Sequence, residues 1–139
     1  MKYLGLDLGS RTLGIAKSDP GGLIASSYKV IRHNEEYDSL LLVVKETCEE
    51  LHIETIVLGY PKNMNNSVGE KGQLSQLFKE KLEKIVNIPI YLQDERLTTK
   101  TATDMLIEGN VSRKNRKKVV DAVAATIILQ SFLDKKGKE

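Results

Sequence analysis

The spacing of apolar residues changes once along this 139-residue chain, and that change constrains its fold more than any other feature. In the first 32 residues apolar and other side chains alternate, which is the period of a β-strand. "DPGG", which begins at Asp19, has turn chemistry, and Asp19 is expected to be a turn residue rather than a ligand. Two successive hairpins predict an antiparallel first half of a sheet. The expected strands span residues 2–8, 12–18 and about 23–32.

From Tyr37 onward the period becomes that of amphipathic helices, and two short apolar runs interrupt it. Short crossover connections between strands and helices require parallel strands. The chain is therefore expected to form one α/β domain over residues 1–139. Its mixed five-stranded sheet has three antiparallel strands, then two parallel strands, and helices on both faces. The expected elements are a helix at 37–51, a strand at 54–59, a helix opened by a Ser67–Glu70 capping box and continuing to about Ile85, a strand at 88–95, a short helix from Thr98 or Thr99 to Gly109-Asn110, a helix from about 115 to 134, and a disordered tail at about 135–139.

Bulk composition excludes several classes of protein. Hydrophobic residues make up 40% and charged residues 29% of the chain, as in soluble globular proteins. The single cysteine, Cys48, excludes a disulfide framework and is expected in the core. The longest apolar stretch, "VVDAVAATIIL", is too short to span a bilayer. We therefore expect a cytoplasmic protein without a membrane partner, whose net charge of +2 does not by itself indicate a polyanion.

Three acidic residues lie where an apolar environment is predicted. Asp7 is near the end of the first strand, on the face shared by Tyr3 and Gly5, and Glu95 ends the fifth strand. Asp121 lies in the final helix, on the stripe that should face the sheet. Ligands of α/β sheets gather beyond the carboxyl ends of strands, so a helix packed across that edge brings the three carboxylates together.

Each carboxylate also has an ordinary interpretation. Asp7 could cap a turn, and Glu95 could pair with Arg96. Asp121 could cap a helix or pair with Lys117 four residues earlier. The three together favour a site more strongly than any of them alone.

Asp94 competes with Glu95 for the place in this site. Asp94 continues the face of Ile90 and Leu92, whereas Glu95 continues the face of Tyr91 and Gln93. Only one of the two can reach the site, and the period of the strand does not choose between them.

Carboxylates without accompanying histidines are the ligands of hard cations, Mg²⁺ or Mn²⁺. Two such ions can activate a water and stabilise the leaving oxygen of a phosphodiester, and their charge would compensate an ionised Asp7. Gly5 and the small face of Gly14, Ala16 and Ser18 are interpreted as room for the metal and the phosphate backbone.

Five cationic residues lie within six positions at the start of the last helix. Positive side chains at a helix N-terminus oppose the macrodipole, so helix stability does not explain them. They could form a solvated helix start, but contacts to nucleic-acid phosphates are favoured. The five residues are Arg113, Lys114, Arg116, Lys117 and Lys118.

Other segments give weaker signals. The loop "GYPKNMNNSVGEKG" precedes a helix and is compatible with an anion site, although its glycines do not match a P-loop. Phe and Tyr residues are scattered and form no pattern of the RNA-recognition type. His33 and His52 lack ligand spacing and are expected at the surface.

Four stretches together resemble the bacterial YqgF family, also called RuvX. They are "LGLDLGSRTLGIAKSDP", "VLGYPKNMNNSVGEKG", "YLQDERLTT" and "RKKVVDAVAATIILQSFLD". The resemblance implies an RNase H-like fold, a cytoplasmic location and metal-dependent endonuclease activity on structured nucleic acid. The implied process is Holliday-junction resolution in DNA recombination or pre-16S rRNA 5'-end processing in ribosome biogenesis.

The resemblance also implies roles for individual residues. The acidic residues of the family correspond to Asp7, Glu95 and Asp121, which would be the catalytic metal ligands, and Arg96 would help to hold the phosphate backbone. Resolvases of the related RuvC type carry a second acidic residue one turn along the last helix, where this sequence has alanine. The loop reads "NMNNS" where the family more often has an acidic-glycine pair.

Two other functions remain open from the sequence. A non-catalytic RNA-binding or ribosome-assembly factor would keep the basic segment and need no metal. "LDLGSRTLGIA" also resembles the first phosphate motif of actin-like and sugar-kinase ATPases, but that fold needs two such domains. A resolvase that cuts two strands would act as a symmetric homodimer, for which the sequence identifies no interface.

Overall fold

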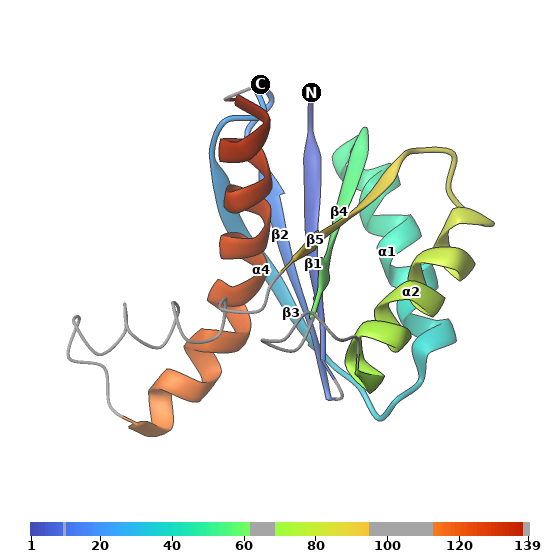
Figure 1. Cartoon of the computed structure of the whole chain (residues 1–139), viewed down its shortest axis with the longest axis vertical. Coiled ribbons are helices and arrows are strands. Elements are labelled where there is room, and N and C mark those ends of the chain that lie inside the picture. Colours follow the sequence, from blue (N-terminus) through green and yellow to red (C-terminus); the bar gives the residue numbers. More distant parts are fainter. Residues whose placement is uncertain (10, 62–68, 95–112, 138–139) are drawn as a thin grey trace.

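The computed structural model describes residues 1–9, 11–61, 69–94 and 123–137 with their side chains, and the helical backbone of residues 113–122. Five strands form one sheet in the order β3-β2-β1-β4-β5. Helix α4 covers one face of this sheet, and α1 and α2 cover the other (Figure 1). The elements are β1 (Tyr3–Leu8), β2 (Thr12–Ser18), β3 (Ala25–Arg32), α1 (Tyr37–Leu51), β4 (Thr55–Tyr60), α2 (Glu70–Glu83), β5 (Ile90–Asp94) and α4 (Arg113–Gly137).

The directions of the strands confirm the predicted mixed sheet. β1 pairs with β2, and β2 with β3, in antiparallel fashion. β4 pairs with β1, and β5 with β4, in parallel fashion. The first two connections are hairpins, whereas α1 and α2 carry the chain over one face before each parallel strand. This topology leaves β3 and β5 as the two edges of the sheet.

The face covered by α1 and α2 is a core of large aliphatic side chains. Every second residue of β1 points into it, which confirms the predicted alternation of that strand. Cys48 is buried here, as expected, and burial raises the pKa of its thiol to about 12. The core residues include Leu4, Leu6, Leu8, Leu13, Ile15, Leu40, Val44, Ile56, Leu58, Phe78 and Leu82.

The face covered by α4 is built from smaller side chains. A Cβ atom added at Gly5 would lie 2.7 Å from the Cβ of Leu129 and 3.1 Å from the carbonyl oxygen of Ala125. Gly5 therefore lets α4 lie close against β1, and the interpretation of Gly5 as room for a metal is wrong. Ala16 is likewise buried in the cluster that α4 forms with the sheet.

The ends of several elements differ from the sequence-based expectation. β3 begins at Ala25 because the Asp19 carboxylate accepts hydrogen bonds from the N–H groups of Leu23 and Ile24, at 2.8 and 2.9 Å. These bonds confirm Asp19 as a turn residue, and they lower the pKa of its carboxyl, with the bond from Ile24 contributing most.

The limits of two helices differ from the predicted ones. α2 begins at Glu70 with Gly69 at its N-cap, and Ser67 of the predicted capping box lies outside the described residues. α4 continues to Gly137, because its last two turns still pack on the sheet through Leu133, so residues 135–137 are helical rather than a disordered tail. The short helix expected at 98–109 lies outside the described residues. Among the helices that the structure describes, none has the length and apolar character to span a bilayer.

Candidate active site

Asp7 lies on the α4 face of the sheet, as its place in the sequence predicts. It is the second-last residue of β1, is half-buried, and pairs in register with Gly14 on β2. Tyr3 and Gly5, two and four residues earlier, point to the same face and contact α4. The carboxylate is therefore held at the end of a central strand, beside a residue without a side chain.

The contacts between β1 and α4 follow a regular progression. Tyr3 lies against Phe132, with ring centroids 6.0 Å apart, and Gly5 lies against Leu129 and Ala125. Two residues of a strand advance about 6.6 Å, close to the 6 Å that four residues of a helix advance. One further helical turn toward the start of α4 leads from Ala125 to position 121, at the level of Asp7. The side chain of Asp121 is not among those described.

Strand β5 shows which face of the sheet Asp94 shares. The ring of Tyr91 stacks on Phe132 of α4, whereas Leu92 packs against the core on the α1 and α2 side. Tyr91 and Gln93 therefore point to the face of the sheet that α4 covers. Asp94 points to the opposite face. Asp94 pairs with Tyr60 in register and is exposed. Glu95, the residue after Asp94, lies outside the described residues.

His33 holds the turn that follows Asp7. Its Nδ1 accepts a hydrogen bond from the N–H of Glu35, so Nε2 carries the proton and donates to the carbonyl of Gly9 at 2.9 Å. Its backbone N–H also donates to the carbonyl of Arg11. His33 is half-buried, so its predicted surface position is wrong, while His52 is exposed as expected. Only strand pairing, which brings residue 33 opposite residue 11, could have indicated this contact.

The other candidate residues are only partly described. Arg96 lies outside the described residues, as do residues 62–68 of the loop proposed as an anion site. The basic segment forms the first turns of α4, which extend beyond the sheet in Figure 1, but its side chains are not described. Among the residues that the structure describes, no three His, Cys, Asp or Glu side chains are grouped to hold a metal ion.

The two alanines that follow Asp121 by three and four residues are buried. Ala124 is 3% exposed and Ala125 is fully buried. Because the backbone of Ala125 already lies against Gly5, a carboxylate at this position would have no space without moving the helix. Close packing of α4 therefore explains why this chain has alanine where RuvC-type resolvases have a further acid.

The family model and the similar proteins of known name agree on one family. A family model described as "RuvX: Holliday junction resolvase" matches residues 1–135. A protein of Bacillus subtilis (strain 168), named "Putative pre-16S rRNA nuclease", is 50% identical over 135 residues and covers 96% of this chain and 98% of its own. A protein of Clostridium acetobutylicum with the same name is 47% identical, with the same coverage of both chains.

Solved structures with the same fold include two resolvases. RuvC of Thermus thermophilus, in complex with a Holliday-junction substrate, superposes with a TM-score of 0.60 and 16% identity, covering 99% of this chain and 96% of its own. The Holliday-junction resolvase of fowlpox virus gives 0.59 and 11%, covering 97% and 99%. These similarities confirm the RNase H-like arrangement that was expected for the sheet and its helices.

Proposed function

Since this chain belongs to the RuvX family, we propose that it is a metal-dependent endonuclease that cleaves phosphodiester bonds of structured nucleic acid. The names of its relatives favour the precursor of 16S rRNA as substrate, and the description of the family favours a four-way DNA junction. We also propose a cytoplasmic location, where either substrate would be met. One observation carries the proposal: Asp7 lies on the α4 face, at the level that position 121 of α4 reaches.

The proposed metal ligands are Asp7, Glu95 and Asp121. Asp7 supplies a carboxylate from the central strand, and Glu95 is favoured over Asp94 because Asp94 has the opposite orientation from Tyr91, which contacts α4. Asp121 is one helical turn before the point where α4 touches Gly5. A donor set of carboxylate oxygens alone fits Mg²⁺ or Mn²⁺ and does not fit a softer metal.

The carboxylates would hold the metal ions, and the residues packed around them would keep the carboxylates in position. Asp7, Glu95 and Asp121 would hold the metal ions together. When bound, a pair of such ions supplies an activated water and stabilisation of the leaving oxygen. The tight packing of α4 on Gly5 and the hydrogen bond from His33 to Gly9 fix the elements that carry the carboxylates. This rigidity keeps the ligands oriented before substrate binds.

The basic segment is proposed to hold the phosphate backbone over these carboxylates. Arg96 and the five cationic residues at the start of α4 flank the proposed ligands in the sequence. If all five contacted phosphates of duplex DNA, the plot of log K against log salt would have a slope of about −4.5, from about −0.9 per contact.

The test compares the wild type with Asp7→Asn on two substrates, a precursor 16S rRNA fragment and a four-way DNA junction, with Mg²⁺ or Mn²⁺. The amide is nearly isosteric and cannot carry the charge, so we expect metal-dependent cleavage to fall at least about 100-fold. Asp38→Asn is the matched control, because Asp38 is exposed on α1, on the other side of the sheet. This control should cleave like the wild type.

Equal metal-dependent cleavage by the wild type and Asp7→Asn would overturn the proposal. Binding of the RNA without any cleavage, and unaffected by loss of the three carboxylates, would instead identify a non-catalytic RNA-binding factor. The preferred substrate follows from the ratio of the two cleavage rates.

A further inference from the structure

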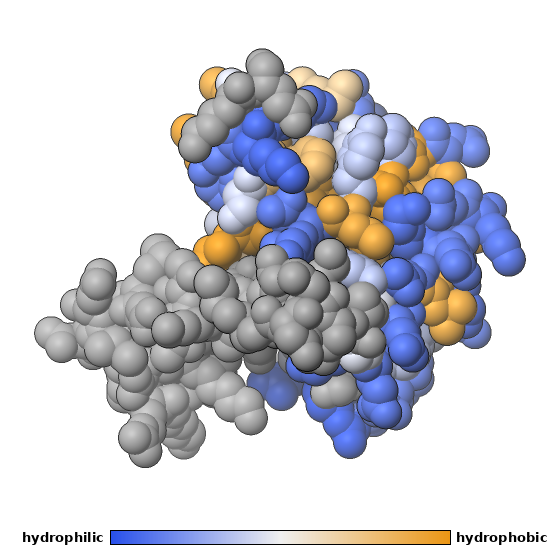
Figure 2. Space-filling view, viewed as in Figure 1, coloured by the Kyte–Doolittle hydropathy of each residue, from blue (hydrophilic) through white to orange (hydrophobic). Residues whose placement is uncertain are grey.

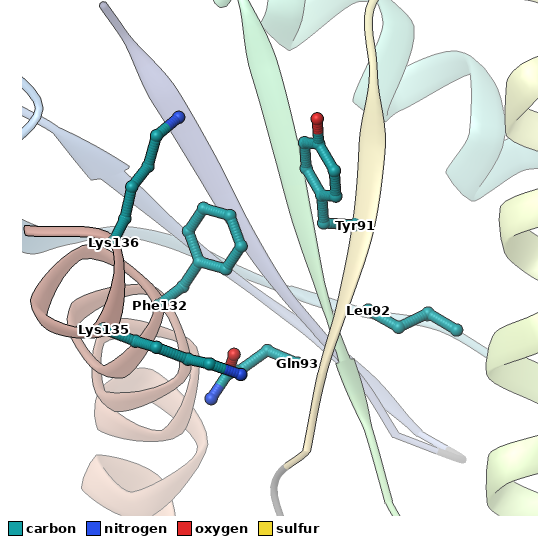
Figure 3. A pocket seen from close by; sticks show the side chains of 6 residues that line it. All are labelled: Tyr91, Leu92, Gln93, Phe132, Lys135 and Lys136. Carbon is teal, nitrogen blue, oxygen red and sulfur yellow. The ribbon is translucent and has the colours of Figure 1, made fainter. Parts of the chain in front are cut away.

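A groove lies on the α4 face, between edge strand β5 and the last turns of α4. It encloses about 300 Å³, near the lower end of the range for ligand pockets. In the surface view, apolar residues lie in a hollow between hydrophilic ones at the front of the molecule (Figure 2). The close-up shows the side chains of α4 and of β5 on opposite sides of this space, with Leu92 turned away from it (Figure 3). The lining residues are Tyr91, Leu92, Gln93, Phe132, Lys135 and Lys136.

Tyr91 forms an exposed aromatic surface in this groove. Its side chain is 48% exposed, a large value for an aromatic residue in a strand. One side of the ring stacks on Phe132, with centroids 5.6 Å apart and planes at 29°. Phe132 in turn packs against the buried ring of Tyr3. The ring of Tyr91 is therefore supported from behind and accessible from solvent, as expected of a surface on which a flat ligand stacks.

The groove is cationic at the end formed by α4. Lys136 donates a hydrogen bond of 2.7 Å to the hydroxyl of Tyr3, and its ammonium lies 5.1 Å from the centroid of that ring. Lys135 is exposed and extends toward Gln93 in the close-up (Figure 3). No acidic residue is among the side chains that line the groove in the described part of the chain. The charge and the aromatic surface together favour an anionic ligand that carries a flat ring.

The groove shares a face of the sheet with the proposed active site. Tyr91 and Gln93 point to the same face of β5, and β5 runs parallel to β4 and β1, so its carboxyl end lies at the same edge of the sheet as that of β1. Asp7 lies on this face, two strands away across β4. A polymer chain bound along β5 could therefore contact the groove and the carboxylates together.

We propose that this groove binds an unpaired segment of the nucleic-acid substrate next to the cleavage site, with one base stacked on Tyr91. Lys135 contacts a phosphate of that segment, and the amide of Gln93 is positioned to hydrogen-bond a base edge. The ligand is single-stranded because bases within a duplex already stack on each other and cannot present a free face to a side chain. This proposal rests on the proposed nuclease function and adds the form of substrate that the site prefers.

The first experiment measures binding without cleavage. Fluorescence anisotropy, in EDTA, compares a labelled RNA hairpin with a single-stranded tail against the same hairpin without the tail. Tyr91→Ala should weaken binding of the tailed hairpin by roughly 5- to 100-fold, the range for loss of one base–aromatic stack. Tyr91→Phe keeps the ring and should bind like the wild type. Neither change should affect the blunt hairpin.

The cationic contact is tested through salt dependence. Lys135→Ala should reduce the slope of log K against log salt by about 0.7 for the tailed hairpin, the value for one phosphate contact to a single strand. Lys84→Ala is the matched control, because Lys84 is also exposed at the end of a helix but belongs to α2, across the sheet. Its slope should equal that of the wild type.

A spectroscopic variant reports stacking directly. The chain contains no tryptophan, so Tyr91→Trp introduces a single indole, and base stacking should quench its fluorescence when the tailed hairpin binds. Unchanged fluorescence, or equal binding of the tailed hairpin by the wild type and Tyr91→Ala, would overturn the groove proposal. Cleavage by the wild type in Mg²⁺ would then still support the nuclease function.

The converse failure is equally distinct. If no variant cleaves but Tyr91→Ala still loses binding of the tailed hairpin, the groove is a single-strand site and the nuclease function is wrong. The proposal would also be wrong if a protein partner occupied the groove and the single-stranded tail had no effect on binding of the hairpin.

Discussion

The two faces of the sheet are built from opposite kinds of side chain. On the α1 and α2 side, β1 contributes three leucines, and Phe78 of α2 is among the largest buried side chains. On the α4 side the same strand contributes Tyr3, Gly5 and Asp7, opposite Ala16 and Gly14 of β2. One face therefore buries apolar volume, while the other lets a helix approach and keeps a carboxylate at the end of the contact.

This difference separates stability from function within one strand. Alternate residues of β1 serve the two faces, so substitutions one position apart should have different consequences. Changes on the α1 and α2 side should lower the free energy of unfolding. Changes on the α4 side should affect cleavage or binding more than they affect stability.

The largest effect on stability is expected from Phe78→Ala. Phe78 is 2% exposed, and its removal leaves a cavity in the apolar core. We expect the free energy of unfolding to fall by about 3–5 kcal/mol, measured by urea denaturation. Phe132→Ala, on the other face, is the comparison, and it should lower stability less because Phe132 is only partly buried. Equal losses would contradict the division between the faces.

The next effect distinguishes the neighbouring acids of β5. Glu95→Gln should reduce metal-dependent cleavage by about 100-fold, because Glu95 is the proposed metal ligand at the end of β5. Asp94→Asn should change cleavage by less than about threefold, because Asp94 points to the opposite face. Both variants should unfold at the same urea concentration as the wild type. A larger loss for Asp94→Asn would reverse the assignment.

A smaller effect is expected where α4 touches the sheet. Gly5→Ala places a methyl group against Leu129 and the backbone of Ala125, and the rigid backbone cannot yield as a flexible side chain does. We expect a loss of about 1–3 kcal/mol in the free energy of unfolding. Cleavage should fall further than the fraction of unfolded protein explains, because the shift of α4 moves Asp121 away from Asp7. Gly137→Ala, where an added Cβ has no atom within 4 Å, provides the control.

The sequence was sufficient to predict the fold because each predicted element has a strong period of its own. The alternation in β1 and β2 and the helical spacing after Tyr37 led to the observed strand directions, whereas the order of the strands in the sheet came only from the structure. Boundaries were less accurate where they depend on particular side chains. The Asp19 turn shortens β3, and the contacts of Leu133 with the sheet carry α4 beyond its predicted end.

The candidate site could be predicted only in part, because its contacts are distant in sequence. Periodicity placed Asp7 on the α4 face but left Asp94 and Glu95 equivalent, and the stack of Tyr91 on Phe132 is a contact between distant residues that shows the orientation of Asp94 alone. Tyr91 and Phe132 belong to aromatic residues that look scattered in the sequence, yet the fold gathers them. The bond from His33 to Gly9 likewise spans 24 residues and leaves no local signal.

The smallest effect on stability is expected from Cys48. Its thiol lies in the core on the α1 and α2 side, so its labelling measures the opening of that core. Its thiol is buried, and a pKa of about 12, above the ordinary 9.0, keeps it protonated at pH 8. A thiol reagent at pH 8 should therefore label the unfolded protein quickly and the native protein only as fast as the core opens. The tailed RNA hairpin is proposed to bind across the sheet from Cys48, so it should slow native labelling only by the factor by which its binding stabilises the whole fold.

The same thiol gives a pH dependence with a definite sign. Above pH 9 the unfolded chain loses the proton of Cys48 while the folded chain keeps it, so the folded state binds more protons. Stability should therefore fall as the pH rises from about 9 toward 12, and Cys48→Ala should remove that part of the fall. Urea denaturation at pH 8 and pH 10 measures both proteins. If the two proteins lose stability equally between pH 8 and pH 10, the protonation of the Cys48 thiol does not contribute to the stability of this face.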